Sequence, residues 1–180
     1  MELDKKLMNI EQERNINKAI QYLEEDKNKN LNTYLRVIFL LLDFLVDSQY
    51  TQEEHNFISL KIKDLFEEAK TKYFNESEFL FFSGMMIYIA EWYFGIKTLD
   101  DAKTMLNKAM QCEPNNIVYK WGYYCIPDQR PEINTEIKFS ISKQILESET
   151  LIQWIKNRGL LGDYLIGIIQ GTYDASRLFI

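Results

Sequence analysis

Few side chains in this 180-residue chain have the type and spacing for chemistry. There is one histidine, His55, and two cysteines, Cys112 and Cys125, which do not form a CxxC pair. These three residues cannot complete a zinc site unless carboxylates are added to them. Asp100 and Asp101 could ligate Mg²⁺, but carboxylates there also suit the first turn of a helix, where they favour the helix dipole. We therefore predict no metal and no cofactor.

Catalysis has equally little support. Glu91 lies in the most apolar long segment of the chain, where it could be a buried catalytic carboxylate or could meet a Lys or Tyr at the edge of the core. The motifs GxxxxGK[ST], GxGxxG, HExxH and GxSxG are all absent. Neither cysteine has a histidine nearby in the sequence, so a thiol nucleophile is unsupported. We predict that the protein is not an enzyme.

The sequence favours recognition of a partner instead. Aromatic residues cluster in the segment 115–128, NNIVYKWGYYCIPD, and Tyr and Trp are common at binding hot spots. The net charge of −6 disfavours nucleic acid and suits a basic protein. Alternatively, the aromatics belong to the core and the acids merely maintain solubility. The predicted binding surface consists of Glu67, Glu68, Asp100, Asp101, Tyr119, Trp121, Tyr123, Tyr124 and Asp128.

The elements that must position these residues are helices. Glycine and proline number only 7 and 3, and 46% of the residues are hydrophobic. Long intervals without helix breakers favour an all-α fold with no sheet, and the length suits a single domain over 1–180. The segment from Phe79 to Gly95 is apolar on every side, so we expect it to be the central helix. The apolar run Val37–Val46 is too short to span a membrane, and it contains Asp43.

Apolar stripes and capping patterns predict about eight helices. Thr51 with Glu54, and Asn75 with Glu78, have capping-box spacing, in which two side chains satisfy free backbone N–H groups. Gly95 should end the central helix, because glycine tolerates the left-handed conformation. The expected helical segments are 1–27 with a break near Asn15, 31–46, 51–73, 75–95, 99–111, a short helix carrying 119–124, 133–147, 150–158 and 160–170.

Two of these helices resemble a tetratricopeptide repeat, a helical hairpin of about 34 residues. With Ser83 as the first position, the key sites hold Met86, Ile89, Ala90, Tyr93, Ala102, Leu106, Ala109 and Pro114. Met86 and Ala90 replace the Trp and Gly of the family pattern, and Leu106 replaces an aromatic residue. The resemblance covers 83–116 and implies an antiparallel hairpin with Gly95–Lys97 in the turn. An ordinary hairpin of a helical bundle is the alternative, because repeat arrays need about three units or more.

Small size, acidity, helical character and the lack of a catalytic motif resemble the immunity proteins of bacterial contact-dependent growth inhibition and related toxin systems. The resemblance implies a cytoplasmic protein that binds and neutralises one cognate toxin domain, commonly a basic nuclease, by occluding its active or substrate-binding site. It implies no direct contact with nucleic acid or membrane, and it leaves a homodimer open. The alternative is a TPR-like adaptor that holds a peptide in a concave groove lined by side chains such as Tyr88 and Glu91.

Overall fold

The computed structural model describes residues 5–26, 29–95, 99–125 and 131–176. These residues form ten α-helices and one 3₁₀ helix and contain no β-strand, which confirms the predicted all-α fold. None of the described helices combines the length and apolar character needed to cross a bilayer. The elements are α1 (Lys5–Gln12), α2 (Ile16–Glu25), α3 (Leu31–Asp47), α4 (Gln52–Tyr73), α5 (Ser77–Ala90), η1 (Glu91–Phe94), α6 (Leu99–Cys112), α7 (Ile117–Cys125), α8 (Pro131–Leu146), α9 (Glu149–Lys156) and α10 (Leu160–Ser176).

Local capping determines where two of the helices begin. The side chain of Asn15 accepts a hydrogen bond from the Lys18 backbone N–H, and Arg14 has a left-handed φ of 49°. The chain therefore breaks between α1 and α2 at the predicted position. The side chains of Thr51 and Glu54 each bond the other's backbone N–H at the start of α4, which is the predicted capping box.

The central helix α5 is found where the sequence predicts it, but its ends differ. Every residue from Phe79 to Ile87 is buried. The predicted capping box is wrong, because Glu76 occupies the cap position and makes no side-chain capping bond. The α-helix ends at Ala90, whose φ of −154° interrupts the helical path, and η1 continues the chain as a 3₁₀ turn. Gly95, predicted to end the central helix, instead ends η1, with a left-handed φ of 67°.

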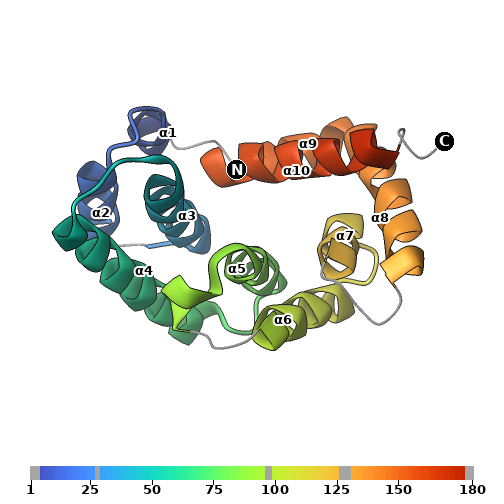
Figure 1. Cartoon of the computed structure of the whole chain (residues 1–180), viewed down its shortest axis with the longest axis horizontal. Helices are drawn as coiled ribbons and strands as arrows, with labels where there is room; N and C mark the ends of the chain where they lie inside the picture. Colours follow the sequence, from blue (N-terminus) through green and yellow to red (C-terminus); the bar gives the residue numbers. More distant parts are fainter. Residues whose placement is uncertain (1–4, 27–28, 96–98, 126–130, 177–180) are drawn as a thin grey trace.

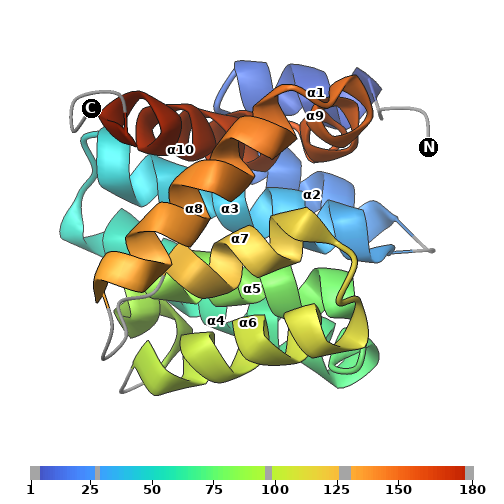
Figure 2. The same ribbon diagram turned by 90° about the vertical axis from the view of Figure 1, so that its right-hand side faces the viewer.

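Three consecutive helical hairpins form the body of the molecule. The pairs are α3 with α4, α5 with α6, and α7 with α8, and the first helix of each pair lies inside the second (Figure 1). α1 and α2 flank α3, while α9 and α10 lie across the opening between α3 and α8 (Figures 1 and 2). The α3–α4 turn, η1 and the end of α7 all lie at one end of the molecule, the left edge of Figure 2.

Small residues let α5 and α6 approach each other closely. A Cβ atom added at Gly84 would lie 2.9 Å from Leu106 Cγ and 3.2 Å from the Ala102 carbonyl oxygen, so no larger residue fits without a shift. Ala102 and Leu106, two positions of the TPR-like pattern, are both fully buried. The first half departs from the pattern, since the hairpin begins at Ser77 and not at Ser83.

A buried arginine fastens the C-terminal hairpin α9–α10 to the central helix. Arg158 lies in the turn between α9 and α10 and pairs with Glu78 of α5 at 2.7 Å. Its guanidinium lies 4.8 Å from the ring centroid of Trp154, and this ring stacks in turn on Phe82 of α5. The inner surface of α5 is therefore covered by α9 and the turn that follows it.

A second buried ion pair joins α1, α3 and the same turn. Arg36 of α3 and Glu11 of α1 form two hydrogen bonds of 2.8 and 2.6 Å, and both side chains are almost completely buried. Gly159 packs directly on this pair in the left-handed conformation, with φ of 58°. A side chain at this position would collide with the Glu11 carboxylate, which explains the glycine.

Candidate partner-binding face

Two of the predicted binding residues belong to the core. Trp121 is fully buried, and its indole N–H donates to Ser142 Oγ at 2.8 Å. Tyr119 is only 2% exposed and packs against Phe81 and Trp154. The prediction that these two rings face a partner is therefore wrong. The reason is that α7 is an inner helix, with α5 on one side and α8 on the other.

The acidic pair on α4 is also less available than the sequence suggests. Glu68 accepts hydrogen bonds from Tyr34 at 2.6 Å, Lys72 at 2.9 Å and Lys29 at 3.3 Å. The bonds from Tyr34 and Lys72 lower the pKa of Glu68 from 4.5 to about 2, so this carboxylate ties α4 to α3. Glu67 remains exposed and forms an ion pair with Lys70 at 3.4 Å.

The remaining predicted residues lie toward one end of the molecule, except Asp128, which is outside the described residues. Asp100 and Asp101 are exposed in the first turn of α6. Tyr123 and Tyr124 are half-buried near the end of α7, with their ring centroids 5.2 Å apart. The beginning of α6 and the end of α7 both lie at the left edge of Figure 2, so the fold brings these four residues to one end.

The same end carries a row of four rings that the sequence pattern does not single out. Tyr50 contacts His55 with centroids 5.5 Å apart, and His55 contacts Tyr93 at 5.9 Å. Tyr93 contacts Trp92 at 5.6 Å. Trp92 is 61% exposed and Tyr50 is 39% exposed, so the row is open to solvent at both ends. We call Tyr50, His55, Tyr93 and Trp92 the ring row.

The interruption at Ala90 is what orients the ring row. In η1, Phe94 turns into the core and packs edge-on against Phe66 with centroids 5.0 Å apart. Trp92 consequently points to the surface, and Tyr93 points toward His55 on α4. The signal in the sequence is three consecutive aromatic residues before Gly95, because one helical face cannot bury three adjacent rings.

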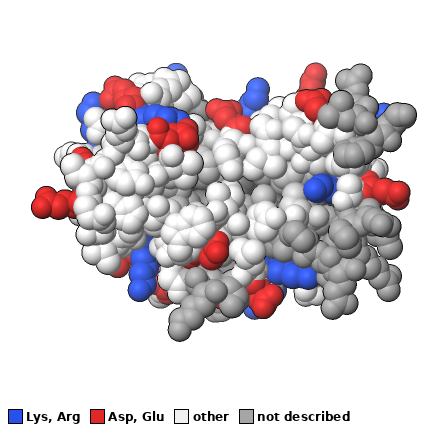
Figure 3. All heavy atoms as spheres, in the orientation of Figure 1, with Lys and Arg blue, Asp and Glu red and all other residues white. Residues whose placement is uncertain are grey.

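Acidic residues lie at the helix starts at this end of the molecule. Helices α4 and α6 begin here, and acidic residues in a first turn favour the helix dipole. In the view of Figure 3, the centre of the visible face is largely uncharged and most charged side chains lie near the margin. We call the ring row and its acidic rim the turn face. The rim consists of Glu53, Glu54, Glu91, Asp100 and Asp101.

The turn face contains His55, the single histidine of the chain. His55 Nε2 lies 3.5 Å from the Tyr93 hydroxyl, and its buried Nδ1 has no described hydrogen-bond partner to orient it as a general base. No group of three or more His, Cys, Asp or Glu side chains able to hold a metal ion occurs in the described parts of the chain. Trp is among the residue types enriched at binding hot spots, and Trp92 is the exposed tryptophan of this face.

Comparisons of the chain with protein-family models, with curated proteins and with solved structures find no match.

Proposed function

We propose that this protein is an immunity protein that binds and neutralises a cognate bacterial toxin domain through the turn face. The observation that carries the proposal is Trp92, a large aromatic residue that is 61% exposed at the end of the ring row and inside the acidic rim. A monomer leaves such a side chain in water at a cost, because burying a large apolar side chain is favourable by about 1.5–3 kcal/mol. A partner that covers Trp92 recovers this free energy.

The proposed partner is a cytoplasmic toxin domain with a basic surface, such as a nuclease. The rim carboxylates occupy the region where the toxin would hold the phosphates of its substrate, so substrate and inhibitor exclude each other. Long-range attraction between the acidic rim and the basic cleft accelerates association. Burial of Trp92 and Tyr50 slows dissociation. Differences in affinity between related complexes arise mostly from their dissociation rates.

The alternative function, a TPR-like adaptor with a peptide in its concave groove, has less support. The inner surface of α5 is covered by Trp154 and Arg158, which stack on Phe82 and pair with Glu78. Opening this groove would expose the buried Phe82 ring beneath Trp154, and exposing buried apolar surface to water is unfavourable. The outer end of the hairpins therefore offers a free surface, whereas their inner side does not.

The test uses the toxin domain that we expect to be encoded immediately upstream of this protein. Trp92→Ala should weaken binding at least about 30-fold, which corresponds to the loss of roughly 2 kcal/mol at a hot spot. It should also abolish protection of cells that produce the toxin. Phe74→Ala is the matched control, because Phe74 is 56% exposed but lies at the opposite end of α4. Equal binding by the wild type and by the Trp92 variant, with unchanged melting temperatures, would exclude the turn face.

A further inference from the structure

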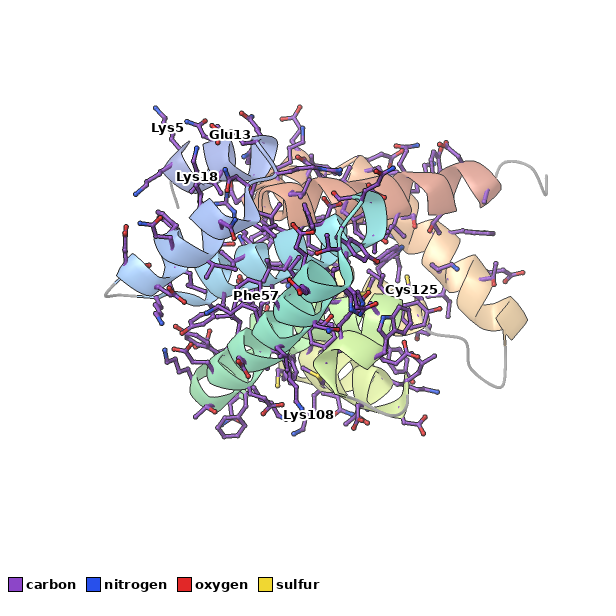
Figure 4. All side chains as sticks on the ribbon, turned by 60° about the vertical axis from the view of Figure 1, so that its left-hand side comes forward. Lys5, Glu13, Lys18, Phe57, Lys108 and Cys125 are labelled. Atoms are coloured by element: carbon purple, nitrogen blue, oxygen red, sulfur yellow. The ribbon has the colours of Figure 1, made fainter. Side chains whose placement is uncertain are left out.

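A second surface, on the outer side of α4, has the residue spacing of a helix-pairing stripe. Six residues follow one another at alternating intervals of three and four along this helix, which places them on one line. They are Phe57, Leu60, Asp64, Glu67, Thr71 and Phe74, and we call them the α4 ridge. The buried stripe of α4, which includes Ile58, Ile62 and Ala69, lies on the opposite side of the helix. Figure 4 shows α4 at the front of the molecule with Phe57 labelled on it.

Large apolar side chains occupy both ends of the ridge. Leu60 is 64% exposed, Phe57 is 53% exposed, and Phe74, the residue that caps α4, is 56% exposed. Single exposed apolar residues are ordinary on protein surfaces. Here the three lie on one 3–4 stripe, with Phe57 and Phe74 about 26 Å apart along the helix axis at 1.5 Å per residue. Because such a stripe drifts by about 20° per heptad around a straight helix, a partner helix of about five turns has to wrap around α4 in a left-handed sense to contact them together.

The middle of the ridge is acidic and restricts what can cover it. Asp64 and Glu67 are exposed side by side between the apolar ends. In an antiparallel pair of two copies, Asp64 of one chain would face Glu67 of the other when the phenylalanines meet. In a parallel pair each acid would face its own copy. Like charges placed opposite each other are destabilising, so a second copy is a poor occupant, and so is an anionic membrane surface.

We propose that the α4 ridge binds an amphipathic helix of another protein. The contact stripe of that helix carries basic residues at its centre, opposite Asp64 and Glu67, and apolar residues near both ends. Lys63 and Lys70 lie along one flank of the ridge and complement acidic residues on the partner's flank. The order of apolar, acidic and apolar residues along the α4 ridge selects both the register in which the partner helix binds and the charge at the centre of its contact stripe. This proposal concerns a different side of α4 from the one that contacts the ring row, so it does not depend on the toxin-binding function.

The test uses two synthetic helical peptides of about 21 residues, or six turns. Both carry leucines at the ends of the contact stripe and glutamates on one flank, but one has two arginines at the stripe's centre and the other has two glutamates. Fluorescence anisotropy with the full chain should show about tenfold tighter binding of the arginine peptide. The double variant Asp64→Lys/Glu67→Lys should reverse this preference. The double variant Asp100→Lys/Asp101→Lys is the charge-matched control and should leave it unchanged.

A third variant, Leu60→Gln, should weaken binding of the arginine peptide about tenfold. Val46→Gln, which changes another exposed apolar residue, should leave this binding unchanged. Melting curves establish that each variant is folded. Equal affinity for the two peptides would overturn the proposal in favour of non-specific apolar contact. Absence of binding by either peptide at about 100 μM, a free energy near −5.5 kcal/mol, would also overturn it. Self-association of the chain in sedimentation experiments would overturn the proposal as well if Leu60→Gln abolished it. The α4 ridge would then bind a second copy of this chain.

Discussion

Glu68 shows how firmly a surface carboxylate can be committed to a fold. Tyr34 donates a hydrogen bond to it, and Lys72 donates both to Glu68 and to the Tyr34 hydroxyl. These bonds lower the pKa of Glu68 to about 2. Asp100 and Asp101, by contrast, are exposed in the first turn of a helix, where their charges face solvent and a partner can reach them.

The pKa of Glu68 leads to a prediction about acid stability. Folding lowers this pKa from 4.5 to about 2, so the stabilisation is complete above pH 4.5 and disappears as the pH falls toward 2. Glu68→Gln should reduce the free energy of unfolding by about 1 kcal/mol or less at pH 7, because the carboxylate is partly solvent-exposed. The difference from the wild type should shrink between pH 4.5 and 2.

Thermal melts of both proteins across the range from neutral pH down to the lowered pKa would measure this difference. Glu67→Gln is the control, because Glu67 is exposed and pairs with Lys70 of its own helix. A gap between the wild type and Glu68→Gln that stays constant down to the lowest pH would contradict the assignment.

At the scale of the helix, the sequence predicts the features that local interactions decide. The breaks at Asn15 and Gly95 and the capping box at Thr51 each depend on neighbours within four residues. The end of α5 at Ala90 does not follow from the local pattern, since it depends on where Phe94 packs in three dimensions.

The candidate site is predicted less completely, for the same reason. Tyr119, Trp121, Tyr123 and Tyr124 all lie on one short helix, so periodicity reveals that some are buried but not which helices cover them. Trp92 does not stand out because the surrounding segment is apolar on all sides, which predicts one continuous buried helix. Burial of Tyr119 and Trp121 depends on the helices packed around α7, which no local pattern specifies.

The buried pair of Glu11 and Arg36 gives a prediction at the same scale. Removing one charge leaves the other without a partner in the core, so Glu11→Gln should lower the free energy of unfolding by about 3 kcal/mol. The double variant Glu11→Leu/Arg36→Met replaces the pair with apolar side chains and should be less destabilised than Glu11→Gln.

Chemical denaturation of the wild type and the two variants measures both differences. Lys18→Met, which removes an exposed charge paired with Glu13, provides the reference for a surface ion pair, and it should cost less than about 1 kcal/mol. If Glu11→Gln costs no more than Lys18→Met, the pair does not hold α1 to α3 as described.

For the molecule as a whole, the hairpin topology determines where a partner can bind. In an array of antiparallel hairpins, the second helices α4 and α6 begin at the end where α3 and η1 finish. The acidic first turns of α4 and α6 and the exposed ring row therefore lie at the same end of the molecule. This surface is assembled from several segments that are separate in the sequence. The C-terminal hairpin covers the inner side, which leaves the ends and the outer helices as the available surfaces.

The acidic rim and the ring row should affect different rates of toxin binding by the whole protein. Reversing two rim charges with Asp100→Lys/Asp101→Lys should slow association about tenfold at low salt and weaken its dependence on ionic strength, because steering acts over the Debye length. The same variant should change the dissociation rate little. Trp92→Ala should do the opposite, with faster dissociation and nearly unchanged association, since it removes a contact made only in the bound complex.

Stopped-flow association and surface plasmon resonance at several salt concentrations measure these rates on the same proteins. Glu67→Lys is the control for charge, because Glu67 is exposed but lies in the C-terminal half of α4, away from the helix start that carries part of the rim. A single reversal at any of these positions changes the net charge equally, but Glu67→Lys should slow association less than a reversal in the rim. Equal slowing by Glu67→Lys and by either single reversal, Asp100→Lys or Asp101→Lys, would mean that net charge alone attracts the toxin. The acidic rim would then have no specific role, and only the ring row would remain as the binding surface.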